Sequence, residues 1–283
     1  MSHLVAYVGN EPDNMACALF SARGALASRS EKPEGWGLGF VQGGDVLLQK
    51  RPRVESHEVD LYGLIKDLRA DAVVGRVGFR SDGSTPAEDA DPFRFRSWLF
   101  GSVGDFGSRD DSDAGFESVR ERLLGSVPDF LRRNIRGQSP SEHMFHLFLS
   151  FLHDAGSLDA PSPSESVVHA ALRNSLTFVE RLLPGGPAAP MRLALVATNG
   201  RCLVAANASY PLRYLHVEGI SDCPVCSGRV DRDRDGRRIQ HEALRAVVLE
   251  ANRDVPSRGG WREVPARAVL IVGADRVPAV SPL

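Results

Sequence analysis

The chain has 283 residues, with 34 basic and 36 acidic side chains and a formal net charge of −2. This near-neutral balance gives no electrostatic basis for binding nucleic acid or an anionic membrane. The hydrophobic fraction of 42% and the charged fraction of 25% are typical of a soluble globular protein. No apolar run approaches the roughly 18 residues of a transmembrane helix. The N-terminus has no basic stretch followed by an apolar one, so a signal peptide is not expected either.

The chain contains four cysteines, and only Cys223 and Cys226 lie close together in the sequence. This usage fits a reducing compartment better than a disulfide scaffold, so we expect a cytoplasmic protein. The length allows one large domain or two modest ones, each with a substantial core. The sequence shows no internal repeat and no linker long enough to force two domains.

The first ten residues predict a buried strand that starts almost at the chain's first atom, because apolar residues alternate along them. Ser2 lies at the start of this stretch. If Met1 is removed, as a small second residue permits, the free amine and the hydroxyl of Ser2 share one residue, which pairs a nucleophile with its own base. The alternative is an ordinary first strand with no chemical role.

Residues 14–27 carry apolar side chains at helical spacing and predict a helix. Residues 34–48 predict a hairpin that turns at two consecutive glycines. Its first strand is unusually rich in glycine, which costs strand stability, so we expect another part of the chain to approach this backbone closely. Residues 59–68 then predict a helix, and residues 72–77 a short buried strand.

The middle of the chain is mainly helical, after a predicted strand over residues 97–106. Helices are predicted over residues 116–124, 130–135, 143–153 and 165–183. Ser139 followed by Pro140 offers a start for the third of these helices. Because that helix is apolar on most sides, it must be buried.

The C-terminal third predicts mainly strands, over residues 191–198, 202–206, 212–216, 243–251 and 269–272. An Asn-Gly pair at residues 199–200 indicates a hairpin turn between the first two. Residues 229–238 alternate in charge and predict a solvated loop or a docking surface. Many strands, with helices clustered between residues 116 and 183, indicate an α+β layered fold.

Six short stretches stand out when taken in order. They are Met-Ser-His-Leu-Val-Ala-Tyr at 1–7, Glu-Gly-Trp-Gly-Leu-Gly at 34–39, Gly-Arg-Val-Gly at 75–78, Asp-Ala-Asp-Pro-Phe at 89–93, Trp-Leu-Phe-Gly-Ser-Val-Gly at 98–104 and Gly-Gln-Ser-Pro-Ser-Glu at 137–142. In this order they resemble the class II glutamine amidotransferases, specifically the small stand-alone glutaminase-like group. The corresponding family motifs are Met-Cys-Arg-Leu-x-Gly-Tyr, Asp-Gly-Trp-Gly-x-Gly, Ala-His-Val-Arg, Asn-x-His-Pro-Phe, Trp-x-Phe-x-His-Asn-Gly and Gly-x-Thr-Asp-Ser-Glu.

The resemblance spans nearly the whole chain and implies one domain over residues 1–283. It also implies the N-terminal nucleophile (Ntn) hydrolase fold, a four-layer αββα sandwich of two antiparallel sheets flanked by helices. The α+β pattern of predicted elements agrees with this fold class.

The resemblance fails at the positions that carry the family's chemistry. In the family, an N-terminal Cys attacks the side-chain amide of glutamine, and an Asn side chain and a Gly backbone N–H form the oxyanion hole. Arg and Asp residues hold the carboxylate and the amine of the substrate. Here the Cys position is Ser2, the Asn position is Val103, the Arg position is Gly78 and the Asp position is Pro140. Gly104 is the residual oxyanion donor that the resemblance implies.

These replacements favour a catalytically degenerate amidotransferase-like protein that is kept as a structural or regulatory subunit. Such a protein would act by binding a protein partner or a second copy of itself. We expect no cofactor, no nucleic acid and no membrane among its partners.

The alternative is an Ntn amidohydrolase that uses Ser2 on an amide substrate other than glutamine, or only weakly on glutamine. Its pocket would then be refitted by Arg76, Ser102 and Asp105. Arg76 or Arg80 could supply a partner for a substrate carboxylate from a position near the family's Arg, although a shift by one residue along a strand would point the side chain the other way.

Cys223 and Cys226 form a single Cys-x-x-Cys motif with no second pair. A closed structural zinc site would need two more ligands, and the candidates are His216, His241 and Cys202. With those ligands unassigned, the motif is a weak metal candidate, and a reduced loop pair or a labile disulfide is the favoured interpretation.

Overall fold

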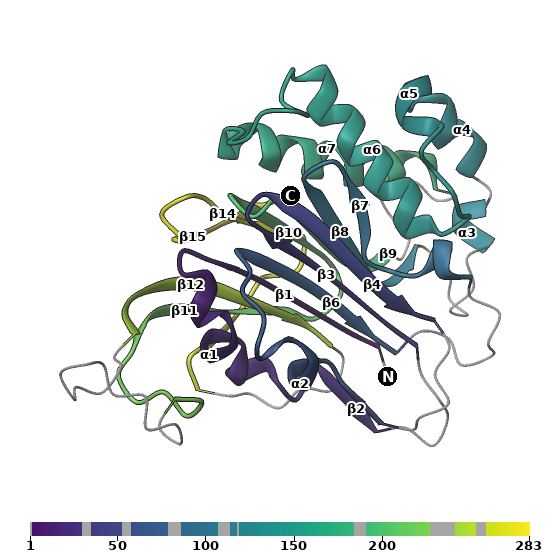
Figure 1. Ribbon diagram of the computed structural model, residues 1–283. Coiled ribbons are helices and arrows are strands. Elements are labelled where there is room, and N and C mark those ends of the chain that lie inside the picture. The colour runs from purple at the N-terminus through teal and green to yellow at the C-terminus, as the bar shows by residue number, and fades with distance from the viewer. Residues whose placement is uncertain are drawn as a thin grey trace.

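The computed structural model describes residues 2–29, 35–52, 58–78, 86–106, 114–117, 119–183, 191–226, 241–252 and 259–283. Two antiparallel sheets are stacked on one another, and helices cover their outer faces (Figure 1). The architecture is therefore the α+β sandwich of two antiparallel sheets that the resemblance implies.

The first sheet has seven strands in the order β13, β11, β12, β1, β6, β3, β4. Their bounds are β1 His3–Gly9, β3 Trp36–Gln42, β4 Asp45–Arg51, β6 Ala72–Val77, β11 Leu212–Ile220, β12 His241–Ala251 and β13 Trp261–Glu263. Strand β1 lies in the middle of this sheet and pairs with β12 on one side and β6 on the other. The buried first strand predicted from the sequence is thus confirmed.

The second sheet has six strands in the order β15, β14, β10, β9, β8, β7. Their bounds are β7 Phe93–Phe95, β8 Trp98–Phe106, β9 Met191–Thr198, β10 Leu203–Ala208, β14 Ala268–Val272 and β15 Pro278–Pro282. A separate two-stranded ribbon joins β2 (Ala27–Arg29) to β5 (Glu58–Asp60).

Helices α6 (Pro140–Asp154) and α7 (Glu165–Leu182) cover the outer face of the second sheet (Figure 1). Three shorter helices precede them: α3 Ala114–Glu117, α4 Arg120–Gly125 and α5 Asp129–Arg132. Helices α1 (Met15–Leu19) and α2 (Leu61–Ile65) lie on the other side of the molecule, against the first sheet. Among the described residues, no helix combines the length and the apolar character needed to cross a membrane.

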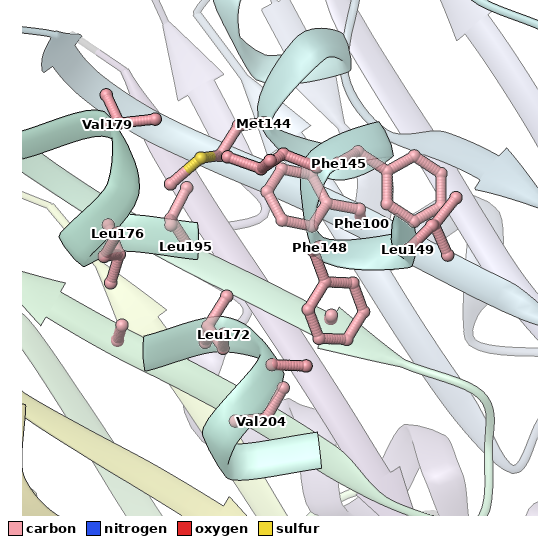
Figure 2. Close-up of a cluster of buried hydrophobic side chains, with 14 of the residues drawn as sticks. Phe100, Met144, Phe145, Phe148, Leu149, Leu172, Leu176, Val179, Leu195 and Val204 are labelled. Carbon is pink, nitrogen blue, oxygen red and sulfur yellow. The ribbon is translucent and has the colours of Figure 1, made fainter. Parts of the chain in front are cut away.

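Three apolar clusters fill the spaces between the four layers. One lies between α6, α7 and the second sheet, where Phe100, Phe145 and Phe148 are fully buried (Figure 2). A second lies between the two sheets, and a third lies between the first sheet and α1 and α2. Strand β1 contributes to both of the latter clusters, because its side chains alternate between the two faces.

Two predicted helices are shorter in the structure. The segment 14–27 is α-helical only over α1 and continues as a 3₁₀ turn at Phe20–Ala22, since both conformations bury a side chain every three to four residues. The segment 59–68 begins as strand β5, and its helix α2 starts only after Asp60, whose side chain accepts a hydrogen bond from the Gly63 amide.

The helix predicted over residues 116–124 is recorded as two short helices, α3 and α4, on either side of residue 118, which lies outside the described residues. The remaining predicted helices and strands of the described chain are present to within a few residues, and both predicted hairpins form. Strands β7, β13 and β15 were not predicted, and each is an edge strand. The charged segment 229–238 lies outside the described residues.

Candidate active site

Ser2 stands at the head of the central strand, next to β6. Its hydroxyl donates a hydrogen bond of 2.5 Å to the carbonyl oxygen of Gly78, the residue that follows β6. Leu4, Ala6 and Val8 of β1 face the other sheet, so the alternation of the strand places Ser2 on the same inter-sheet side. Ser2 is half-buried.

Arg76 shares this face and this end of the sheet. It pairs with Leu4 in the ladder between β1 and β6, and its β6 neighbours Ala72 and Val74 face the inter-sheet core. Its guanidinium donates a hydrogen bond of 2.9 Å to the Val77 carbonyl. The structure therefore places Arg76 on the same face and at the same end of the sheet as Ser2. The other candidate, Arg80, lies outside the described residues.

Strand β8 carries Val103 and Gly104, which align with the family's oxyanion-hole residues, toward the same end of the molecule. Arg276 donates hydrogen bonds to the carbonyls of Gly9 and Gly200, so the turn between β9 and β10 lies at the end of β1 remote from Ser2. Because β8 starts beside that turn, with Leu99 paired to Thr198, it runs toward the Ser2 end. Val103 and the residues after it therefore approach the nucleophile position.

Val103 is 2% exposed and packs in the apolar cluster between the sheets. Gly104 follows with φ of 118°, and a Cβ at this position would lie 2.0 Å from the Arg192 carbonyl oxygen. Only glycine fits at position 104, and the residue before it, Val103, offers no hydrogen-bond donor in its side chain.

Asp105 and Ser102 differ in where they point. Asp105 lies opposite Arg192 in the ladder and shares the inter-sheet side with Val103, at the open end of the sandwich. The hydroxyl of Ser102 instead donates to Ser141 Oγ at 2.8 Å, on the side of α6. The second sheet thus separates the Ser102 side chain from Ser2, whereas Asp105 and Arg76 share its face.

A buried carboxylate that the sequence did not single out holds this region together. Asp91 Oδ1 accepts hydrogen bonds from the Ser102 amide at 2.8 Å and from Ser141 Oγ at 2.7 Å. Burial raises the pKa of Asp91, although the charge of Arg76 and the two hydrogen bonds oppose the rise. Arg76, Asp91 and Ser102 occupy the three positions where the quoted family motifs have His, so two groups of opposite charge and a hydroxyl stand in place of three imidazoles.

The N-terminus of α6 is fixed by two further carboxylates. Asp89 accepts from the backbone amides of Gln138 and Ser139, and Glu142 accepts from the amides of Arg136 and Gly137. Helix α6 then begins with proline at its first position, where the family has its substrate-binding Asp. The loop geometry is therefore stabilised by side chains, but proline offers no carboxylate to a glutamine amine.

Cys223 and Cys226 lie far from Ser2, on the connection that leads from β11 toward β12. The structure brings them together with Cys17 of α1 and His241 of β12. Of the other ligand candidates named from the sequence, neither His216 nor Cys202 belongs to this group. No disulfide joins any of the four cysteines, all of which lie in the described residues.

Solved structures with the same fold are class II amidotransferase-like. A glutamine aminotransferase class-II domain protein from Silicibacter pomeroyi matches with a TM-score of 0.56 and 16% identity, over 99% of this chain and 98% of that one. A predicted glutamine amidotransferase from Pseudomonas aeruginosa matches with a TM-score of 0.53 and 13% identity, over 96% and 98% of the two chains. The glutamine phosphoribosylpyrophosphate amidotransferase from Bacillus subtilis matches with a TM-score of 0.52 and 14% identity.

The last of these matches covers 99% of this chain and 49% of the other, so this chain spans about half the length of that protein. No protein-family model and no curated protein sequence matches this chain. At these identities the likeness concerns the fold, which is that of the class II glutamine amidotransferase-like proteins.

Proposed function

We propose that this protein is a catalytically degenerate class II glutamine amidotransferase-like domain that works as a structural or regulatory protein-binding subunit. The observation that carries the proposal is Val103. This apolar side chain occupies the oxyanion Asn position and is packed in the core between the sheets. No rotation of a valine can supply the missing hydrogen-bond donor.

The expected losses in rate and in substrate binding argue against efficient glutamine hydrolysis. Loss of one oxyanion donor costs on the order of 10²- to 10³-fold in rate. The absence of a charged partner at Gly78, and of another at Pro140, weakens substrate binding by roughly 1.5 to 3 kcal/mol in each case. Serine adds a further handicap, because its hydroxyl is far from ionised at neutral pH, whereas a few per cent of a cysteine is thiolate.

A binding role is supported by the intact core of the fold and by two exposed leucines on its surface. The layers and the buried core are intact although the reactive groups are replaced. Leu64 and Leu68, at and just beyond the end of α2, are 53% and 36% exposed and lie one helical turn apart, which suits contact with a protein partner or a second copy of the chain. Four cysteines without a disulfide support a reducing, cytoplasmic environment.

The decisive test is an assay of ammonia release from glutamine by the purified protein, with Ser2→Ala as the matched control. We expect no turnover above the control. Ser2→Cys alone should remain inactive, because the oxyanion and carboxylate positions stay unfilled. Glutamine turnover by the wild-type chain that disappears in Ser2→Ala would contradict the proposal.

A second candidate, an amidohydrolase that uses Ser2 on another amide, is supported by the placement of Arg76 and Asp105 on the inter-sheet side with Ser2. It requires the free amine of Ser2. Intact-mass analysis that finds Met1 retained would therefore exclude this candidate. If Met1 is removed, a panel of amides other than glutamine, assayed with Ser2→Ala as control, distinguishes the two functions.

A further inference from the structure

Four potential metal ligands converge at the end of the first sheet that is remote from Ser2. They are the thiols of Cys17, Cys223 and Cys226 and the imidazole of His241, whose ligand atoms all lie within 4.8 Å of one another. Cys17 and Cys226 are separated by 209 residues in the chain, yet their sulfurs are 3.6 Å apart. His241 Nε2 lies 3.4 Å from the Cys226 sulfur.

These separations match a tetrahedral zinc site. Zn–S bonds of about 2.3 Å and Zn–N bonds of about 2.0 Å place two sulfurs about 3.8 Å apart, and a sulfur and a nitrogen about 3.5 Å apart. The observed 3.6 Å and 3.4 Å agree with those values to a few tenths of an ångström. These two distances suit ligands of one tetrahedral ion, and the four ligand atoms together lie within 4.8 Å of one another.

The donor set and its burial favour zinc. Three cysteines and one histidine form a closed structural zinc set, and the two-residue spacing of Cys223 and Cys226 is the usual one for such sites. Cys17, Cys223 and His241 are 7%, 5% and 3% exposed.

The elements that carry the ligands explain what the ion would do. Cys17 lies on α1, Cys223 and Cys226 on the connection after β11, and His241 at the start of β12. Helix α1 packs on the outer face of the first sheet, away from α6 and α7 (Figure 1). One ion would therefore fasten this short helix and the segment with Cys223 and Cys226 to the end of strand β12 in the first sheet.

We propose that Cys17, Cys223, Cys226 and His241 bind one Zn²⁺ ion as a structural site. The site has no open coordination position and lies remote from Ser2, so it acts on the stability of the fold and not on an amide substrate. Its presence does not depend on whether the Ser2 site is active.

The test begins with the metal content of the full chain, purified under reducing conditions without a metal-affinity column. Elemental analysis is expected to find one zinc per chain. The zinc-free protein, prepared with a chelator, should take up one equivalent of Co²⁺ and show the visible absorption of tetrahedral cobalt thiolate. Chelation should lower the melting temperature, and added Zn²⁺ should restore it.

Cys17→Ser is the informative variant, because serine keeps the size of the side chain and removes the thiolate. Cys202→Ser is its matched control, since Cys202 is also buried but contacts Asn199 and not the cluster. We expect the zinc content to fall from one per chain to none in Cys17→Ser and to stay at one in Cys202→Ser.

If Cys17→Ser does not fold, the Co²⁺ titration of the wild-type protein decides. A wild-type chain that contains no zinc and binds no Co²⁺ would overturn the proposal. A disulfide within the cluster in protein kept under reducing conditions would overturn it as well.

Discussion

His146 shows how a single buried side chain couples this fold to pH. It is 2% exposed on α6, and burial lowers its pKa from 6.5 to about 4, more than the hydrogen bond to the Glu142 carbonyl can offset. The unfolded chain takes up a proton below about pH 6.5, whereas the folded chain does so only near pH 4. The stability that neutral His146 contributes is therefore complete above pH 6.5 and is lost as the pH falls toward 4.

We expect His146→Phe to flatten this pH dependence. The shift corresponds to roughly 3 kcal/mol of unfolding free energy between pH 7 and 4. Phenylalanine can keep the edge contacts to Phe95 and Phe145, and Nε2 has no hydrogen-bond partner to lose among the described residues. Urea unfolding at several pH values measures the effect. His153→Phe, at an exposed site of the same helix, is the control, and an equal flattening there would contradict the prediction.

Gly37 is a position where the sequence correctly indicated a close approach. A Cβ added to it would lie 1.9 Å from the Asp91 carbonyl oxygen, so the glycine-rich strand leaves room for the segment that carries this carboxylate. We expect Gly37→Ala to lower the unfolding free energy by about 1 to 3 kcal/mol through overpacking. Gly125→Ala, where nothing lies within 4 Å of the new carbon, should leave it unchanged in the same denaturant titration.

Cys17 is a residue whose role as a possible metal ligand could not be predicted from the sequence. The pair Cys223 and Cys226 was visible as a motif, and His241 was one of the candidate ligands, but nothing near Cys17 in the sequence marks it as a ligand. Only the fold brings it within reach of residues more than 200 positions away. Asp91 was missed for a related reason, because a carboxylate in a loop gives no sign that it will be buried.

At the level of elements, α6 was the most predictable helix because it combines a capped start with an apolar surface on nearly all sides. The structure shows why: α6 contacts strand β8 of the second sheet, α7 and the shorter helices α4 and α5, so most of its circumference is covered (Figure 1). Edge strands β7, β13 and β15 gave no comparable signal. They have three to five residues and one neighbour each, which leaves too few alternating positions to define a period.

The core beneath α6 should be sensitive to loss of volume. Phe148 is fully buried and meets Trp98 edge to face, with ring centroids 5.3 Å apart. We expect Phe148→Ala to lower the unfolding free energy by about 3 to 5 kcal/mol, because apolar burial is reduced and a cavity is left behind. Phe130→Ala on α5, where the side chain is 37% exposed, should cost much less, and comparable losses in both variants would argue against this account of the core.

For the whole molecule, the fold was inferable from the sequence because packing residues such as Trp36, Pro92 and Trp98 carry the family pattern. For the chemistry of the site, the sequence showed only which of the family's reactive residues are replaced. Which side chains share the face of Ser2 depends on strand alternation and sheet stacking, and these separate Ser102 from Arg76 and Asp105. A sequence pattern alone could not decide whether a side chain of β8 faces the other sheet or α6, because the two sheets meet only in the folded chain.

Arg276 is the side chain that ties the two sheets together at the end remote from Ser2. It is 7% exposed and donates hydrogen bonds to the carbonyls of Gly9, at the end of β1, and of Gly200 and Arg201, in the turn between β9 and β10. Burial lowers the pKa of Arg276, yet the guanidinium fork can satisfy several carbonyls at once, which a lysine ammonium at the same place cannot.

We therefore expect Arg276→Lys to lower the unfolding free energy by about 1.5 to 3 kcal/mol, the value of one charge-assisted hydrogen bond. Arg23→Lys is the control, because Arg23 is exposed and bonds one carbonyl of its own turn. Calorimetry should still show a single transition in Arg276→Lys, since the apolar cluster between the sheets remains to couple them. Two separate transitions would instead mean that this one guanidinium, and not the shared core, makes the sandwich unfold as a unit.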